Sequence, residues 1–444
     1  RRLPARSDEG EGDIGRRRRI LASFGNGSYV GNTEFGTPMT NGGRPVNKPN
    51  IVWLLTDHHV FKHHVDSSGP RPEMPTFDRL CAEGIRFSQA HSVCPLCTPA
   101  RASMMTGQYV HRHGMTMNDG NCDSRLDFEP DQKLFGHFLR DAGYRTAYFG
   151  KWHCGRERTP QEFGFEGWSL PGYGYPYGSE RYRQYLSDHD LPEPTVEVEW
   201  NLRHPDTAGE EVNLCEEKGG ARLGCSAGVL KTPPETHESW FVTQLAVDWL
   251  EQAAKGDEPF CLRVDVWGPH QPYYPAGSYA GSVDAGSIPE PPNFREAFGD
   301  KPSNYRACFD FWDGPLSDMT WEDWQPVVAR CYENEAMVDG AMGRVLDALE
   351  RLGLNENTLV IYTSDHGDLI ASHGGNWDKG SLMVEETVRV PLVARWPAAI
   401  RPGSVSRALV SNMDIVPTIL AAAGAEMPTP MDGDSFLALA QDPR

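Results

Sequence analysis

The sequence has no long apolar run, no excess of basic residues and few cysteines for its length. None of its apolar stretches approaches the roughly 18 residues that a membrane-spanning helix needs, so no membrane span is expected. The 42 Lys and Arg residues are outnumbered by 62 Asp and Glu residues, which gives a formal net charge of −20. A chain this acidic repels polyphosphate, so binding to nucleic acid in general is excluded. The 10 cysteines are scattered too sparsely for a small disulfide-bonded scaffold.

Aromatic residues, by contrast, are plentiful, with 12 Trp, 15 Tyr and 18 Phe. This composition supports a folded core rather than wholesale disorder. Residues 1–48 differ because they are polar and glycine-rich, and we expect an irregular N-terminal arm in which Arg16–Arg19 is a solvated charge cluster. The chain starts with neither a signal-peptide-like apolar segment nor a methionine, so a longer natural N-terminus is expected. The localisation therefore stays open between the cytoplasm and the periplasm or the exterior.

From residue 49 onward, short apolar runs alternate with segments of helical periodicity. Strands are predicted at 50–56, 85–90, 144–149, 260–267, 358–363 and 391–396. Helices are predicted at 75–84, 133–142, 240–254, 329–352 and 414–423. This alternation predicts an α/β fold with a mostly parallel central sheet flanked by helices on both faces. We expect one catalytic domain over 49–444 with long insertions or lids near 155–234 and 273–324, which are rich in Pro, Gly and aromatic residues.

Side chains with metal-binding or acid–base chemistry follow four of the predicted strands. In open α/β sheets, ligands bind beyond the carboxyl ends of the strands, so these side chains should gather at one edge. They are Asp57 and His58 after the first strand, Lys151 and His153 after the third, His270 after the fourth, and Asp365 and His366 after the fifth. One such residue after a strand often only begins a loop. Four together predict a functional site.

A further motif, Cys97-Thr-Pro-Ala-Arg101, predicts the start of a helix. Thr98 is a good N-cap and Pro99 suits the first helical position, which places Cys97 at a helix N-terminus. Unpaired backbone N–H groups and the helix dipole favour an anion there. Arg101 lies one turn further on the same face. A nucleophile, a helix N-terminus and an arginine together indicate a site for a tetrahedral oxyanion.

The pattern Cys-x-Pro-x-Arg resembles the signature of the type I, formylglycine-dependent sulfatases of the alkaline phosphatase superfamily. The resemblance extends from about residue 49 to the end of the chain. It includes NIVWLLTD, CTPARASMMTGQY, FGKWH, WGPHQPY, TSDHGD and SNMDIVPTILAAAG in the family's order. The implied activity is hydrolysis of a small-molecule or saccharide sulfate ester. The family normally continues with a smaller C-terminal subdomain, which we expect to be missing from this chain.

The resemblance implies a role for each matching residue. Cys97 would be oxidised by a formylglycine-generating enzyme, and the hydrated aldehyde would be the nucleophile. Three cations would bind the sulfate oxygens and the formylglycine diol, namely Arg101, Lys151 and Lys379. His153 would be the base that expels sulfate. His270 would lie near the leaving-group oxygen, with Lys379 as its partner or as the alternative acid.

The resemblance also implies a divalent cation. Its ligands would be Asp57, Asp365, His366 and the modified Cys97. Oxygen-rich ligation suits Ca²⁺, and one imidazole keeps Mn²⁺ or Mg²⁺ open. Many sulfatases carry a second Asp where this chain has His58, while choline sulfatases and phosphonate monoester hydrolases have Gln. His58 is thus a metal ligand, a donor to a ligand or a neighbour of the sulfate, and a phosphonate monoester or phosphodiester hydrolase stays open as the alternative activity.

Other interpretations of the same residues also stay open. Cys94 and Cys97 form a C-x-x-C that is compatible with a redox pair or half a zinc site. His63 and His64 are expected on a loop surface. The aromatic segment 168–185 is either core packing or, as we favour, a wall or lid of the substrate pocket. If Cys97 is never converted, the protein is a non-catalytic anion-binding relative.

Overall fold

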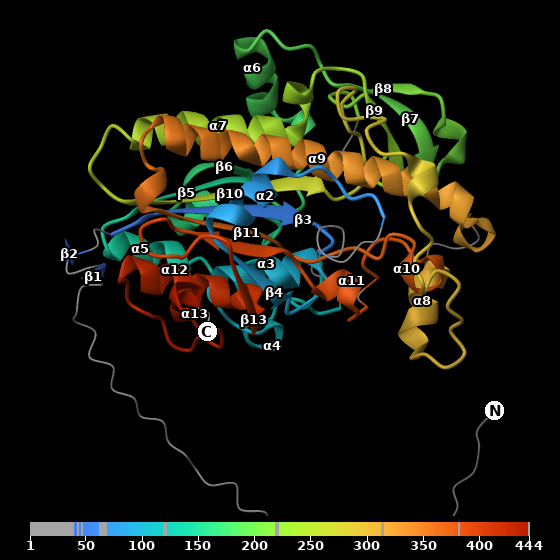
Figure 1. Ribbon diagram of the computed structural model, residues 1–444. Helices are drawn as coiled ribbons and strands as arrows, with labels where there is room; N and C mark the ends of the chain where they lie inside the picture. Colours follow the sequence, from blue (N-terminus) through green and yellow to red (C-terminus); the bar gives the residue numbers. More distant parts are fainter. Residues whose placement is uncertain are drawn as a thin grey trace, which may run out of the picture.

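The structure is a computed structural model that describes residues 40–41, 44–45, 48–61, 69–118, 122–217, 222–311, 315–380 and 382–442 (Figure 1). The Arg16–Arg19 cluster, His63 and His64 lie outside the described residues. Of the predicted N-terminal arm, only 40–41, 44–45 and 48 are described, and the first two of these segments form the short antiparallel pair β1 (Thr40–Asn41) and β2 (Arg44–Pro45).

An eight-stranded sheet forms the centre of the molecule. Its strand order is β13 (Ser404–Ser411), β4 (Ile85–His91), β12 (Leu392–Arg395), β11 (Thr358–Ser364), β3 (Asn50–Asp57), β10 (Phe260–Pro269), β5 (Arg145–Lys151) and β6 (Glu166–Leu170). All neighbouring pairs are parallel except the two that β12 forms with β4 and β11. The predicted mostly parallel sheet is therefore confirmed.

Helices cover both faces of this sheet, as predicted (Figure 1). One face carries α2 (Pro75–Glu83), α7 (Glu238–Ala253) and α9 (Trp321–Arg351), and the other carries α3 (Cys97–Thr106), α5 (Phe135–Asp141), α12 (Ile415–Ala423) and α13 (Leu437–Gln441). Successive side chains of a strand point to opposite faces. Accordingly, Val52 and Leu54 of β3 join one apolar core, whereas Ile51, Trp53 and Leu55 join the other.

The segments predicted as insertions contain their own elements. Residues 155–234 include β6, which joins the central sheet, α6 (Glu180–Asp188), and a three-stranded antiparallel sheet of β8 (Glu211–Asn213), β7 (Thr195–Asn201) and β9 (Ser226–Leu230). Residues 273–324 include α8 (Ser303–Phe311) and the first turn of α9. The remaining short helices are α4 (Val110–His113), α10 (Ser372–Gly375) and α11 (Glu385–Val388).

Outside the predicted insertions, helix α9 and strand β13 also differ from the sequence-based expectation. Helix α9 begins at Trp321, eight residues before the predicted start, because Thr320 and Asp323 form a capping box ahead of Pro326. Proline normally interrupts a helical pattern, so periodicity places the start later. Strand β13 was not predicted, since a register shift between Ser406 and Leu409 breaks its alternation.

A buried carboxylate joins two helices on the same face of the sheet. Asp339 of α9 accepts hydrogen bonds from the backbone N–H groups of Thr76 (2.8 Å) and Phe77 (2.9 Å) in the first turn of α2. The residue that precedes α2, Met74, has no side-chain cap of its own. Asp339 therefore takes the place of the missing N-cap.

We expect Asp339→Ala to lower the free energy of unfolding by about 2–4 kcal/mol, because two buried N–H groups lose their acceptor. Urea denaturation measures the change. The matched control is Asp347→Ala on the same helix, whose side chain is 75% exposed and should change the stability by less than about 0.5 kcal/mol. Equal effects of the two substitutions would show that the α2 contact does not stabilise the fold.

Candidate active site

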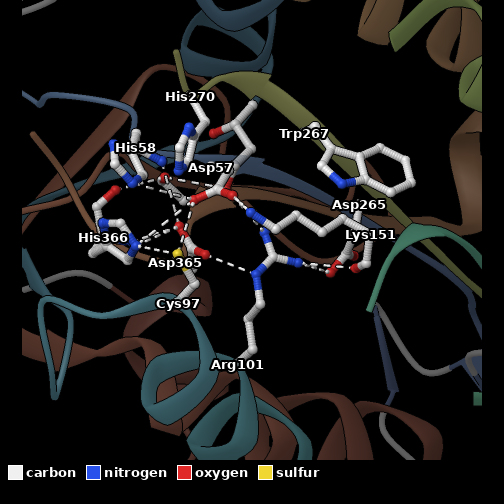
Figure 2. Close-up of polar contacts among 12 residues, drawn as sticks. Asp57, His58, Cys97, Arg101, Lys151, Asp265, Trp267, His270, Asp365 and His366 are labelled. Atoms are coloured by element: carbon white, nitrogen blue, oxygen red, sulfur yellow. Dashed lines mark hydrogen bonds and ion pairs between the residues drawn. The ribbon is translucent and has the colours of Figure 1, made fainter. Parts of the chain in front are cut away.

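The four strands that end in reactive side chains are neighbours in the sheet. Strands β11, β3, β10 and β5 lie side by side and are parallel to one another. Their carboxyl ends therefore meet at one edge of the sheet, where Figure 2 shows the predicted side chains converging from different strands. The topology explains why residues about 300 positions apart, such as His58 and Asp365, come into contact.

Cys97 occupies the first turn of α3, with a correction to the predicted cap. The helix begins at Cys97 and Leu96 is the N-cap, so Thr98 and Pro99 are its second and third residues. Proline is tolerated at the third position because the N–H groups of the first turn have no partner within the helix. Asn118 accepts the hydrogen bond of the Thr98 N–H at 3.0 Å. The buried Cys97 thus still lies at the positive end of α3.

The predicted metal ligands lie together around Cys97 (Figure 2). The Cys97 Sγ lies 3.1 Å from His366 Nε2 and 3.7 Å from Asp57 Oδ1. One ligand atom each of Asp57, His58, Cys97 and His366 lies within 4.8 Å of the other three. Asp365 borders this group, since its Oδ1 is 3.7 Å from His366 Nε2 while its Oδ2 accepts from Arg101. Carboxylate and imidazole donors at this spacing fit a divalent cation.

Two buried cations lie beside this group. The Arg101 guanidinium donates to Asp365 Oδ2 (2.8 Å) and to Asp265 Oδ2 (3.0 Å). Its Nη2 lies 3.7 Å from Asp57 Oδ2 and has no hydrogen-bond acceptor among the described residues. The Lys151 ammonium donates to Asp57 Oδ2 and lies 4.1 Å from the centre of the Tyr173 ring. Arg101 therefore keeps a buried donor available for an oxyanion.

Lys379 joins the two histidines on the other side of the site. Its Nζ lies 2.6 Å from His58 Nε2, 3.0 Å from Asp378 Oδ1 and 3.5 Å from His270 Nε2. His58 Nδ1 contacts Asp368 Oδ2 at 2.8 Å, and His270 Nδ1 contacts its neighbour's backbone oxygen at 2.7 Å. Both imidazoles thus carry their proton on Nδ1 and accept from Lys379 through Nε2. The contact between His270 and Lys379 is the one that the resemblance implies.

The charge states follow from burial and neighbouring charges. Burial, together with the positive charges of Lys151 and Arg101, holds the pKa of His153 well below its ordinary value, so its imidazole is neutral. Burial and the nearby Lys379 lower the pKa of His270 to about 3. Burial alone would raise the pKa of Asp57, but Lys151 above all holds it well below its ordinary value. The site therefore combines carboxylates and ammonium groups with the neutral imidazoles of His153 and His270. Burial alone would lower the pKa of His366, but Asp365 and Cys97 raise it to about 9.

Several residues of the site were not predicted from the sequence. Asp265 links Arg101 to Arg263, whose Nε and Nη2 each lie 2.8 Å from a carboxylate oxygen. Two opposite charges within the apolar strand FCLRVDVW were a usable signal, since a buried charge is costly unless it is paired. Asp368, which contacts His58, lies in the segment 364–368 that follows the predicted strand 358–363, but the sequence gave it no individual role. Asp378, which contacts Lys379, gave no signal because it lies in a loop without periodicity.

The two cysteines of the C-x-x-C motif are not joined by a disulfide in the structure. Cys94 and Cys97 are both free thiols, and burial raises the pKa of Cys94 to about 11, which disfavours its thiolate. Cys94 is also absent from the group of ligand atoms around Cys97.

Among the described residues, no helix is both long and apolar enough to cross a bilayer.

The structure is that of an α/β protein in which buried cations and a group of possible metal ligands lie at the carboxyl edge of the sheet. Comparison with protein families gives a narrower answer, because the Sulfatase family model matches residues 49–425. The chain therefore belongs to the sulfatase family of the alkaline phosphatase superfamily and is a sulfuric ester hydrolase. The predicted family and enzyme class are confirmed.

Individual relatives are similar over most of this chain. An N-acetylglucosamine-6-O-sulfatase of Bacteroides thetaiotaomicron is 28% identical, over 88% of this chain and 70% of the relative. An ulvan-active sulfatase of Formosa agariphila is 27% identical, over 89% of this chain and 66% of the relative. A structure solved with its substrate D-glucosamine-2-N,6-O-disulfate has a TM-score of 0.67 at 25% identity, over 89% of this chain and 81% of the other chain. A phosphonate monoester hydrolase from Silicibacter pomeroyi shares the fold, with a TM-score of 0.67 at 21% identity, over 88% and 76%.

Proposed function

We propose that the protein hydrolyses a saccharide sulfate ester with a formylglycine made from Cys97. The observation that carries the proposal is the position of Cys97 in the first turn of α3, 3.1 Å from His366 and 3.7 Å from Asp57. The sulfate of the substrate would lie between this residue and the cations of the site. The proposal that the substrate is a saccharide is supported by two similar proteins, one named N-acetylglucosamine-6-O-sulfatase and one solved with a sulfated glucosamine. A formylglycine-generating enzyme is the maturation partner that the proposal requires.

Each charged or basic side chain then has a defined task. The three cations Arg101, Lys151 and Lys379 bind the sulfate oxygens and stabilise the charge that develops on them. The hydrated aldehyde of a formylglycine supplies a hydroxyl that attacks sulfur and a second hydroxyl through which sulfate is later expelled. His153, neutral at physiological pH, accepts the proton of that second hydroxyl. The pair of His270 and Lys379, whose side-chain nitrogens are 3.5 Å apart, would supply the proton that the leaving oxygen needs.

The proposed cation is Ca²⁺, with Mn²⁺ and Mg²⁺ as alternatives. Asp57, Asp365, His366 and the converted Cys97 would hold it, and His58 would join them only where its Nε2 binds the cation in place of the Lys379 ammonium. The cation would supply positive charge that orients the nucleophile. The fit rests on the donor set, in which carboxylates from β3 and the loop after β11 lie 3.7 Å from one imidazole nitrogen.

Removal of the cation gives a prediction with two readouts. We expect dialysis against EDTA to abolish turnover and to lower the melting temperature, because the ion binds only the folded protein. Adding back Ca²⁺, Mn²⁺ and Mg²⁺ separately identifies the natural ion by the largest recovery of both quantities. Unchanged activity and melting temperature after complete removal of metal would overturn the cation site.

Phosphonate monoester or phosphodiester hydrolysis is the second candidate, and the observation that favours it is His58 at the position of the usual second aspartate. A panel of sulfate, phosphate and phosphonate esters distinguishes the two. We expect the highest kcat/KM for a sulfate ester. A higher value for a phosphonate monoester or a phosphodiester would replace the proposed reaction by the second one.

A further inference from the structure

A cavity of about 250 Å³ opens beside the reaction centre. His270 and Tyr173 form the boundary between the two. The ring centres of Tyr173 and His270 are 5.6 Å apart, and Tyr173 also faces Lys151 and His153. A group bound in the cavity therefore lies next to the imidazole that we place at the leaving-group oxygen. The cavity is thus positioned to receive the alcohol part of the ester.

The walls of this cavity present mainly apolar surfaces, because most of their polar atoms are already paired within the protein. Tyr175 donates to the backbone oxygen of Leu214, and the Tyr177 hydroxyl accepts from the N–H of Glu238. The Tyr274 hydroxyl contacts Ser226, and the Trp267 indole donates to the backbone oxygen of Tyr173. The aromatic rings are left to pack against a ligand. This supports the prediction that the 168–185 segment contributes a pocket wall.

The carboxylate of Glu238 is also paired. It accepts from the backbone N–H groups of Trp267 (3.2 Å) and Gly268 (2.8 Å) and from the Ser239 hydroxyl (2.7 Å). Glu238 thereby fixes the carboxyl end of β10, which carries His270. It is a positioning residue and not a partner for a ligand.

Gln271 is the residue of the described cavity lining that has a buried side-chain polar atom without a hydrogen-bond partner. Only 4% of the surface of this residue is exposed. The Oε1 atom of its amide is buried and has no hydrogen-bond partner among the residues that the structure describes. A buried polar group without a partner is costly, so a native protein usually retains one for a ligand or a water. Gln271 directly follows His270 in the chain.

We propose that this cavity binds the pyranose ring of the substrate and that the Gln271 amide hydrogen-bonds hydroxyl groups of that ring. A pyranose has an apolar C–H face that packs on tyrosine rings and a rim of hydroxyls that pairs with an amide, which both donates and accepts. An aryl or alkyl group would fill the same space but leave the buried amide without a partner. The inference rests on the proposed function for the orientation of the ester. It goes beyond that function by identifying Gln271 as the residue that recognises the sugar hydroxyls.

The test measures binding without turnover. In a Cys97→Ala background, which cannot form formylglycine, calorimetry compares inorganic sulfate, 4-nitrophenyl sulfate and the 6-sulfates of glucose, galactose and N-acetylglucosamine. We expect at least one sugar sulfate to bind about tenfold or more tightly than inorganic sulfate. Adding Gln271→Met, which keeps the side-chain length and removes the amide, should abolish that advantage and leave inorganic sulfate and 4-nitrophenyl sulfate within about threefold.

Controls separate this inference from the proposed function. Gln184→Met, at an exposed glutamine of α6, should change no affinity. Leu223→Trp, which fills the cavity from another wall, should weaken the sugar sulfate if Gln271→Met proves too unstable to study. The inference is wrong if no sugar sulfate binds more tightly than inorganic sulfate. It is also wrong if the higher affinity for a sugar sulfate persists in both Gln271→Met and Leu223→Trp. Either result holds whether or not the enzyme hydrolyses sulfate esters. If the gain is present and depends on Gln271 but the matured wild-type enzyme turns over no sulfate ester, the proposed function fails alone.

Discussion

Replacing Cys97 with alanine is expected to abolish turnover and to leave the fold intact. The side chain that becomes the nucleophile is lost, and with it the thiol that lies 3.7 Å from Asp57 Oδ1 and 3.1 Å from His366 Nε2. Alanine is well tolerated in the first turn of a helix, and the removed sulfur atom is small. Turnover of a sulfate ester and the melting temperature are measured together.

The matched control for this substitution is Cys94→Ala. Cys94 lies three residues earlier, is a free thiol and has no place among the metal ligands. We expect it to retain kcat within about threefold of wild type. If Cys97→Ala kept more than a trace of activity, or if Cys94→Ala lost as much, the assignment of Cys97 as the formylglycine precursor would be wrong.

Lys151→Ala and Lys379→Ala are each expected to lower kcat by about 10²-fold or more. Both ammonium groups are buried at the site, where a preorganised charge stabilises the transition state far more than it would in water. Burial would lower the pKa of Lys379, but Asp378 and other anionic neighbours raise it above its ordinary value, so its positive charge is kept. Steady-state kinetics with a sulfate ester gives the change, and circular dichroism shows whether each variant folds.

Lys231→Ala serves as the control for a lost ammonium group. Lys231 forms an ion pair with Glu197 on the surface, where its side chain is 44% exposed. It has no proposed role in catalysis or in substrate binding. We expect kcat to stay within about twofold of wild type. A folded Lys379→Ala variant with kcat within a few-fold of wild type would refute the assignment of Lys379 as a sulfate-binding residue.

The sheet and the site core were predictable because their information is local. Apolar runs give the strands, and the parallel topology then gathers whatever follows them, so Asp57, Lys151 and His270 meet at one edge without further knowledge. The charged pair of Arg263 and Asp265 in a buried strand was equally visible in the sequence. The pairing of Asp265 with the predicted Arg101 was not visible, because contacts between side chains of α3 and β10 depend on the three-dimensional packing.

The loop after β11 is a second part of the site whose structure could not be predicted from the sequence. Ile370, Ala371, His373 and Asp378 all have positive φ values, between 23° and 66°, which residues other than glycine seldom adopt. No periodicity describes such a backbone, so the positions of Asp368 and Asp378 against His58 and Lys379 could not be inferred. His58 itself has a φ of 65°, which turns its ring toward this loop. Loop geometry of this kind is set by tertiary contacts rather than by local propensity.

The most direct test of the central claim is the mass of the tryptic peptide 87–101 from an enzyme preparation that hydrolyses sulfate esters. Conversion of Cys97 to formylglycine lowers the mass by about 18 Da, because sulfur and two hydrogens are replaced by one oxygen. Cys94 in the same peptide is an internal control, since iodoacetamide should alkylate it and leave position 97 unmodified. The account predicts the lower mass and a single alkylation. A peptide of unchanged mass that is alkylated at both cysteines, from a preparation that is fully active, would contradict it.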